Sequence, residues 1–103
     1  MKSFNEKVYE KLKKVPKGKV ITYKELAKSV KSDAYRAVGN AMKNNEDPVK
    51  IPCYKVVCSD GFVGNYSGGG MKKKIKLLRK DGIEVNNNKI DLKKYLFKAQ
   101  DIM

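Results

Sequence analysis

The stretch TYKELAKSVKSDAYRAVGNAMK, residues 22–43, predicts two short helices joined by a tight turn. Thr22 and Glu25 stand at the two ends of a capping box, in which each residue can satisfy a free backbone amide of the other. The tripeptide Lys31-Ser32-Asp33 is typical of a turn. Four residues after it fall on the inward face of the second helix: Ala34, Ala37, Val38 and Ala41. Two helices joined in this way indicate a helix-turn-helix, whose second helix usually faces DNA.

The outer face of that second helix is polar. Arg36, Asn40 and Lys43 follow one another at spacings of four and three residues, which places them on one stripe. A helix that contacts DNA would present such a stripe, and so would an ordinary solvated helix. These three residues alone leave both interpretations open.

Ahead of this unit the sequence predicts a longer helix. Residues 3–6, SFNE, form another capping box, and Pro16-Lys17-Gly18 ends the helix. Its apolar stripe consists of Phe4, Val8, Leu12 and Val15. A short extended segment, Val20-Ile21, then leads into the helix-turn-helix.

Behind the unit, apolar segments alternate with turns. Residues 51–58, IPCYKVVC, form a compact apolar segment. Residues 65–70, NYSGGG, form a flexible glycine-rich loop, in which the backbone can approach a ligand closely. A helix is predicted from Met71 to Asp81, with Gly82 as its stop. Its inward residues are Ile75 and Leu78.

The length of 103 residues suits one small domain, and we find no internal repeat or linker. We therefore predict a single domain over residues 1–103 of mixed α/β class, mostly helical, with a winged-helix-like helix-turn-helix and short strands. Residues 83–103 are a C-terminal extension, predicted as a hairpin over 83–92 followed by a short helix over 93–100.

Charge narrows the classes of partner. Lys and Arg number 24 against 11 Asp and Glu, a net charge of +13, which attracts polyanions such as nucleic acid. Solubility alone is the other explanation. The lysines are spread through periodic segments, which favours a folded basic face over a disordered arm.

Compartment and chemistry are also constrained. No apolar run approaches the roughly 20 residues that span a bilayer, and residues 1–14, MKSFNEKVYEKLKK, carry charges throughout, unlike a secretory signal. We expect no membrane association and a cytoplasmic, nucleoid-associated or otherwise intracellular location with the DNA.

The absence of histidine excludes Cys-His and Ser-His dyads and histidine-containing zinc sites. Two cysteines make a poor metal site, so we expect no metal and no cofactor.

Cys53 is the candidate nucleophile. A thiolate is the reactive form of cysteine, and a basic environment with nearby backbone amides favours it. A cysteine in an apolar run is more commonly a small buried core residue, so the segment alone leaves both roles open.

Taken in order, these motifs resemble the DNA-binding, active-site domain of the O6-alkylguanine-DNA alkyltransferases. The family pattern is Arg-Ala-Val-Gly, then Asn-Pro, then Ile-Pro-Cys-His-Arg-Val, then an Asn-Tyr-Ser-Gly-Gly loop. The matching positions here are residues 36–39, Asn45, residues 51–57 and residues 65–69. The resemblance runs from about Phe4 to Gly82.

The resemblance implies a suicide repair protein. A damaged guanine would flip out of the duplex into a pocket, and the thiolate of Cys53 would attack the alkyl carbon on guanine O6. Guanine is restored, and the thioether on Cys53 is permanent. The implied partner is double-stranded DNA carrying O6-alkylguanine, bound by a protein that we expect to be a monomer.

The resemblance also implies roles in holding the DNA. Arg36 would enter the base stack from the minor groove. Asn40 and Lys43 are expected to face DNA because they share its polar stripe, and not because of the resemblance. Tyr23 would crowd the backbone phosphate and donate to the flipped base. Asn45 would brace the turn around the active site.

A second set of matched positions implies the pocket. Met42 would form an apolar wall, and the main-chain carbonyls of Cys53 and Val56 would accept from the guanine amino group. Tyr66 and Ser67 would close over the base and donate towards O6.

Three matched positions depart from the family pattern. Tyr54 replaces the histidine that links the thiol, through water, to an acidic residue, here Asp81. Neutral tyrosine, with a reference pKa near 10, is a weak proton acceptor. Three outcomes stay open: a Cys53–water–Tyr54–Asp81 chain activates the thiol, the local field activates it, or the thiol reacts slowly. Lys55 replaces an arginine and loses its bidentate fork, and Lys74 matches the pocket lysine only after a one-residue shift.

Two other functions stay open. Alkyltransferase-like proteins bind such lesions without accepting the alkyl group. They generally lack the cysteine, so Cys53 argues against this function, whereas Tyr54 keeps it open. A helix-turn-helix regulator is the third function, and it leaves the Pro-Cys segment and the Tyr-Ser-Gly-Gly loop unexplained.

Overall fold

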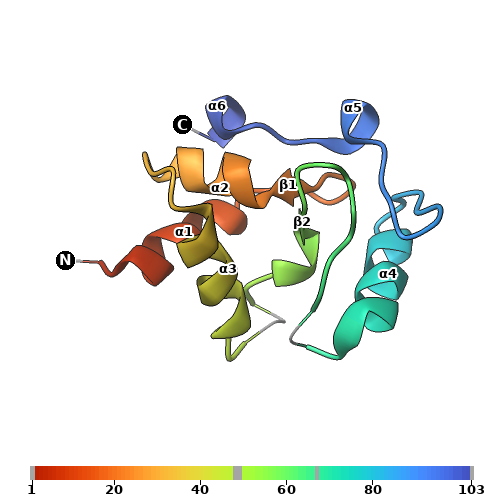
Figure 1. Ribbon diagram of the computed structural model, residues 1–103, viewed down its shortest axis with the longest axis horizontal. Helices are drawn as coiled ribbons and strands as arrows, with labels where there is room; N and C mark the ends of the chain where they lie inside the picture. Colours follow the sequence, from red (N-terminus) through yellow and green to blue (C-terminus); the bar gives the residue numbers. More distant parts are fainter. Residues whose placement is uncertain (1, 48–49, 67, 103) are drawn as a thin grey trace.

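The computed structural model describes residues 2–47, 50–66 and 68–102, and Figure 1 shows their arrangement. The elements, in chain order, are α1 (Phe4–Leu12), β1 (Ile21–Thr22), α2 (Tyr23–Ser29), α3 (Tyr35–Lys43), the 3-10 helix η1 (Cys53–Lys55), β2 (Val56–Val57), α4 (Gly70–Lys80), α5 (Leu92–Tyr95) and α6 (Ala99–Ile102). Helices dominate, and the two strands are short. The expected mixed, mostly helical class is confirmed.

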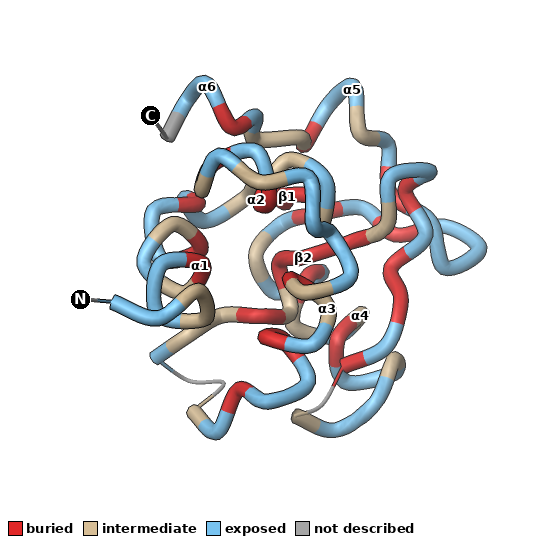
Figure 2. Tube along the Cα trace, turned by 60° about the vertical axis from the view of Figure 1, so that its left-hand side comes forward, coloured by how far each residue is buried: buried red, intermediate tan, exposed pale blue. Residues whose placement is uncertain are grey.

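The two strands pair in parallel at the centre of the molecule. Ile21 lies opposite Val56 and Thr22 opposite Val57, and all four residues are buried (Figure 2). The pairing joins two hydrophobic cores. Ile21 and Val56 belong to the first core, with the inner faces of α1, α2 and α3, whereas Val57 belongs to the second core, with α4 and the C-terminal segment.

The helix starts follow the predicted caps. The Ser3 and Thr22 hydroxyls each accept from the backbone amide three residues on, at 3.1 Å. The prediction that Ala34 points inward is wrong, because Ala34 precedes the first residue of α3 and is exposed. The turn uses this residue instead, since the Ser32 hydroxyl accepts from the Ala34 amide at 3.0 Å.

The predicted hairpin over residues 83–92 is reduced to a tight turn. Asn86 and Lys89 form a single antiparallel bridge around it. Residues 88–90 pair instead with the segment at 61–63: the Val63 amide donates to the Asn88 carbonyl at 3.0 Å, and the Ile90 amide to the Gly61 carbonyl at 2.9 Å. The single predicted C-terminal helix is divided into α5 and α6, because the chain between them is extended at Leu96.

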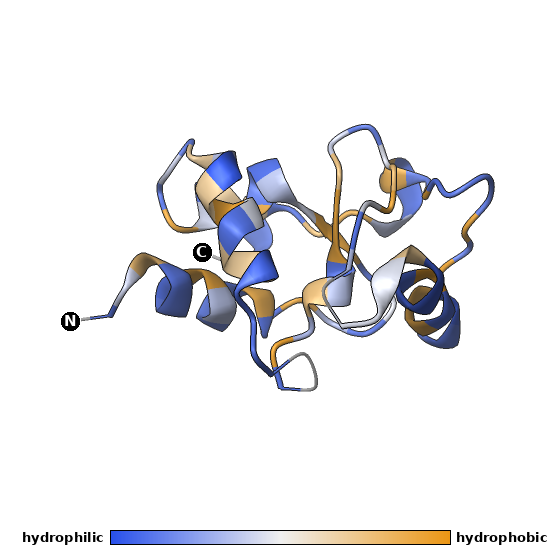
Figure 3. Cartoon of the chain, turned by 60° about the horizontal axis from the view of Figure 1, so that its bottom comes forward, coloured by the Kyte–Doolittle hydropathy of each residue, from blue (hydrophilic) through white to orange (hydrophobic). Residues whose placement is uncertain are grey.

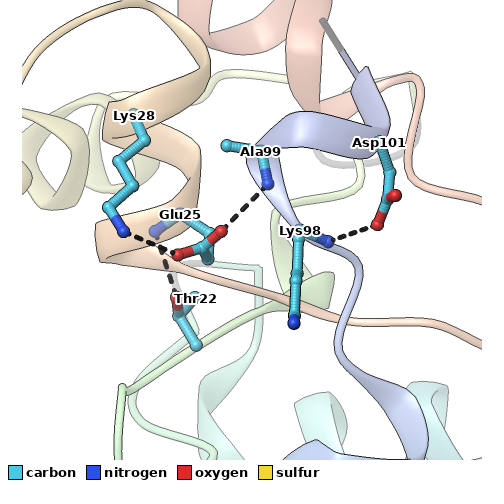
Figure 4. Close-up of polar contacts among 6 residues, drawn as sticks. All are labelled: Thr22, Glu25, Lys28, Lys98, Ala99 and Asp101. Carbon is cyan, nitrogen blue, oxygen red and sulfur yellow. Dashed lines mark hydrogen bonds and ion pairs between the residues drawn. The ribbon is translucent and has the colours of Figure 1, made fainter.

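Residues 95–101, which run from the end of α5 through the extended Leu96 into α6, are called the C-terminal strap here. The strap pairs in parallel with Val20, the residue just before β1. The Val20 amide donates to the Tyr95 carbonyl at 2.9 Å, and the Phe97 amide donates to the Val20 carbonyl at 2.8 Å. The strap also forms a hydrogen bond to the first turn of α2. Figure 4 shows the Ala99 amide donating to the Glu25 carboxylate at 3.0 Å, while Lys28 forms an ion pair with the same carboxylate. Glu25 therefore joins the helix-turn-helix to the strap.

Glu25→Ala should lower the free energy of unfolding by about 1–3 kcal/mol, because a hydrogen bond to a charged group contributes about that much. Urea denaturation followed by circular dichroism measures the change. Glu6→Ala is the matched control, since Glu6 is also in the first turn of its helix but is exposed. Equal effects of the two substitutions would show that the Glu25–Ala99 contact adds nothing.

Candidate functional site

A cavity of about 800 Å³ lies between α3 and the chain segments that follow η1 and β2. Seven residues that the sequence predicted as site residues are in its described lining: Tyr23, Arg36, Asn40, Met42, Lys43, Cys53 and Tyr66. Residues from the second helix of the helix-turn-helix and the candidate nucleophile thus share one cavity.

Cys53 is the first residue of η1 and is only 4% exposed. Its amide donates to the Ile51 carbonyl at 2.8 Å, and its carbonyl accepts from the Val56 amide, so the backbone on both sides is fixed. The side chain packs with the first core and also lines the cavity. Cys53 is therefore a core residue that also lines the cavity, and its role as a nucleophile stays a prediction.

The α3 wall of the cavity is basic and exposed. Arg36, Asn40 and Lys43 lie along it in the described lining, on the face of α3 opposite the buried Val38 and Ala41. The predicted stripe is thus exposed at the mouth of the cavity. A negatively charged ligand at this mouth would be attracted.

Behind η1, Tyr54 and Asp81 meet as the match predicts. The Tyr54 hydroxyl donates to Asp81 Oδ2 at 2.6 Å, across 27 residues of chain. Burial, together with this hydrogen bond and the Asp81 charge, raises the pKa of Tyr54 well above its ordinary value. Tyr54 is therefore a neutral hydrogen-bond donor near pH 7, and the Asp81 carboxylate accepts its hydrogen bond.

Asn45 braces the loop that leads to Cys53. It is 7% exposed, and its side-chain amide donates to the Ile51 carbonyl at 2.8 Å. Its Oδ1 accepts from the Asp47 amide at 3.0 Å. Asn45 does not line the cavity but holds the backbone two residues before the thiol.

Lys74 is fully buried on the inner face of α4, next to a half-buried Ile75 that the pattern placed inward. Its Nζ donates to the Val56 carbonyl at 2.6 Å and to the Asn65 carbonyl at 3.1 Å. Burial lowers the pKa of Lys74 to about 8, and the nearby thiols of Cys58 and Cys53 offset part of this lowering. The Val56 carbonyl, expected to receive a guanine amino group, already accepts from Lys74 and keeps one lone pair.

Two further residues, Lys55 and Tyr9, connect the elements around the site through side-chain hydrogen bonds to backbone carbonyls. Lys55 is 7% exposed and donates to the Val15 carbonyl at 2.8 Å, which ties η1 to the end of α1. The Tyr9 hydroxyl donates to the Ala41 carbonyl at 2.5 Å, which ties α1 to α3. The sequence analysis missed Tyr9, because it lies beside the apolar stripe of its helix and gives no signal of its own.

Cys58 and Gly64 also line the cavity and were not predicted as site residues. Gly64 has a φ of +75°, and a Cβ there would lie 3.5 Å from Cys58 Sγ, 3.7 Å from Lys74 Nζ and 4.0 Å from the Tyr23 hydroxyl. Burial raises the pKa values of Cys58 and Tyr23. Both groups are therefore protonated near pH 7, unlike a nucleophile in its reactive form.

The glycine loop packs against its own tyrosine. A Cβ on Gly68 would lie 2.6 Å from the Tyr66 ring, so the loop closes tightly over that side chain. The close approach of this loop to a ligand stays a prediction. Ser67, the other residue expected to close over the base, lies outside the described residues.

A second hollow of about 670 Å³ adjoins the first, sharing Tyr23, Gly39 and Cys58 with it. Its described lining does not include Cys53. In the described ranges no group of three or more Cys, Asp or Glu residues is arranged to hold a metal ion. The same ranges contain no helix of the length and apolar character needed to cross a membrane. The cavity lined by Cys53 is the candidate site, because it joins the thiol to the polar face of α3.

Comparison with known proteins agrees with this geometry. The model of the family described as 6-O-methylguanine DNA methyltransferase, DNA binding domain, matches residues 3–83. The chain belongs to this family. A bifunctional methyltransferase/endonuclease of Picrophilus torridus is 47% identical over 95 residues, covering 91% of this chain and 32% of that protein. The methylated-DNA–protein-cysteine methyltransferase of Homo sapiens is 55% identical over 69 residues, covering 65% and 33%. The chain thus spans about a third of the length of these relatives.

Solved structures of the family share the fold. The O6-methylguanine-DNA methyltransferase of Pyrococcus kodakaraensis superposes with a TM-score of 0.71 at 46% identity, over 81% of this chain and 48% of that one. S. pombe Atl1, solved in complex with damaged DNA containing O6-carboxymethylguanine, gives 0.83 at 29% identity, over 95% of this chain and 99% of that one. The Atl1 match is longer than the family match and therefore extends into the C-terminal extension.

Lys74→Met should remove a pH dependence from the stability of this family member. Between pH 8 and the ordinary lysine pKa of 10.5, the unfolded chain keeps a proton that folded Lys74 has released, so stability rises with pH. From pH 8 to 9 the wild-type free energy of unfolding should gain about 1 kcal/mol relative to the variant.

Urea denaturation at pH 7, 8 and 9 measures this difference. Lys73→Met is the matched control, because Lys73 is the exposed neighbour on the same helix. The control should follow the wild-type curve. Parallel curves for wild type and Lys74→Met would contradict the lowered pKa.

Proposed function

We propose that this chain repairs alkylated DNA by transferring an alkyl group from O6 of guanine to Cys53. The observation that carries the proposal is the shared cavity, which places the Cys53 thiol across from the exposed polar face of α3. A nucleotide flipped out of a duplex bound at α3 would reach the thiol without a large rearrangement. The names of the relatives support this chemistry.

The reaction is a displacement at the alkyl carbon. A bond forms between Cys53 Sγ and that carbon, and the bond between the carbon and guanine O6 breaks with its electron pair on the guanine. The thiol proton passes through water and the Tyr54 hydroxyl to Asp81, and the departing guanine anion takes a proton from solvent water, so the thiol loses one proton and the base gains one. The 2.6 Å contact between Tyr54 and Asp81 supports this route. The product thioether cannot be reversed, so each molecule reacts once.

The proposed roles of the other residues follow from their places. Arg36 fills the gap in the base stack, with Asn40 and Lys43 beside it on the exposed wall. Tyr23 faces the phosphate of the flipped nucleotide, and Tyr66 covers the base. Met42 provides the apolar wall, and Asn45 acts as a positioning residue through the Ile51 carbonyl.

A second function is lesion binding without transfer. The observation that favours it is the match to Atl1, which covers 99% of that chain and was solved with damaged DNA. Tyr54 in place of the family histidine is consistent with a slow or inactive thiol. The presence of Cys53 in the cavity favours transfer.

The two cysteines allow a matched test of transfer. Cys53→Ala should abolish transfer of labelled methyl from duplex DNA containing O6-methylguanine, because the nucleophile is lost. Cys58→Ala should transfer within about threefold of the wild-type rate, a change of well under 1.4 kcal/mol in the barrier. Single-turnover labelling followed by gel electrophoresis measures both rates.

Thermal melting checks that each variant is folded, and duplex binding checks that the α3 surface is intact. Transfer by folded Cys53→Ala would overturn the assignment of the nucleophile. Lesion binding by the wild type with no transfer would establish the second function instead.

A further inference from the structure

The outer face of α4 carries five exposed cations: Lys72, Lys73, Lys76, Arg79 and Lys80. At about 100° per residue they fall within an arc of roughly 120°, so they form one stripe. This stripe is called the α4 basic face here. It lies opposite the buried Lys74 and Leu78 and is separate from the cavity lining.

Lys72, Lys76 and Lys80 repel one another along the helix, whereas the last-turn position of Arg79 and Lys80 suits the helix dipole. The first turn of α4 holds Lys72 and no acidic residue, although the positive end of the helix dipole lies there. Lys72 and Lys76, and Lys76 and Lys80, are like-charge pairs at a spacing of four, which destabilise a helix. The stability of the fold does not explain this arrangement.

Internal counter-charges are scarce as well. Asp81 is the single acidic residue between positions 61 and 83, and its carboxylate accepts from Tyr54. Over the described ranges the ion pairs are Lys2–Glu10 and Lys28–Glu25, both far along the chain from α4. Arg79 donates to the Val85 carbonyl. The stripe therefore presents strong positive charge to solvent.

The helix starts beside the candidate site. Tyr66 lines the cavity, and α4 begins at Gly70, four residues later. Figure 1 shows α3 and α4 on separate sides of β2, and Figure 3 shows hydrophilic residues (blue) and hydrophobic residues (orange) along the same helices. From Lys72 to Lys80 the stripe runs about 12 Å, at 1.5 Å per residue. One DNA strand presents three or four phosphates over about that length.

We propose that the α4 basic face is a second phosphate-binding surface, which contacts the DNA backbone beyond the duplex segment held by α3. The proposal rests on the proposed function, because it takes DNA as the partner. It predicts a wider electrostatic footprint than the helix-turn-helix alone would give. Several phosphates neutralised on this face would release their counterions and steepen the salt dependence of binding.

The test compares two triple variants of equal charge loss. In the first, Lys72, Lys76 and Lys80 are changed to Gln, and in the control Lys7, Lys13 and Lys17 are changed to Gln on the exposed side of α1 and the turn after it. Affinity for an undamaged duplex is measured by fluorescence anisotropy from 50 to 300 mM NaCl. We expect the slope of log K against log salt to flatten by about 1 to 3 in the α4 variant, near 0.9 per lost phosphate contact. The control should change by less than about 0.5.

Thermal melting provides a second readout. Removing like-charge repulsion should leave the melting temperature of the α4 variant unchanged or higher, so weaker binding cannot be ascribed to unfolding. Equal slope changes in both variants would show a general effect of net charge and overturn the proposal. An unchanged α4 slope beside intact lesion binding would overturn the proposal alone, whereas no duplex binding by the wild type would overturn the proposed function too.

Discussion

The pairing of Ile21 with Val56 and of Thr22 with Val57 is the contact on which the site depends. Thr22 is at once a strand residue and the N-cap of α2, and Val56 follows directly on η1. Two rungs of backbone hydrogen bonds therefore fix the start of the helix-turn-helix relative to the Cys53 thiol. Each strand is too short to be stable alone, so the two cores on either side hold them together.

Local sequence patterns predict the helix ends correctly where the hydrogen-bond partners are close in sequence. Ser3 and Thr22 cap their helices, and Gly82 ends α4 with a φ of +87°, as their neighbours predict. In the capping box of Thr22 and Glu25 only the Thr22 half forms. The Glu25 carboxylate accepts from the Ala99 amide rather than from the backbone amide at its own helix start. That partner lies 74 residues away and appears only when the strap is folded.

The buried lysines are a clearer case of contacts that a local sequence pattern cannot predict. A hydrophobic pattern assigns Lys55 and Lys74 to solvent, yet both are buried with an ammonium group against backbone carbonyls. Those carbonyls, at Val15 and Val56, become partners only through the tertiary fold. The resemblance to the alkyltransferases placed Lys74 near the pocket. It also placed Asp81 at the acidic position that is linked to the thiol. No periodicity in the sequence could have paired Tyr54 with Asp81.

The most direct test of the account is the intact mass of the protein after incubation with duplex DNA containing O6-methylguanine, followed by mapping of the modified peptide. The account predicts a gain of a single methyl group, saturating at one per chain, on the peptide that contains Cys53. Tight binding of the lesion with no gain in mass would contradict transfer and show that a thiol beside the Tyr54–Asp81 pair recognises the lesion without reacting.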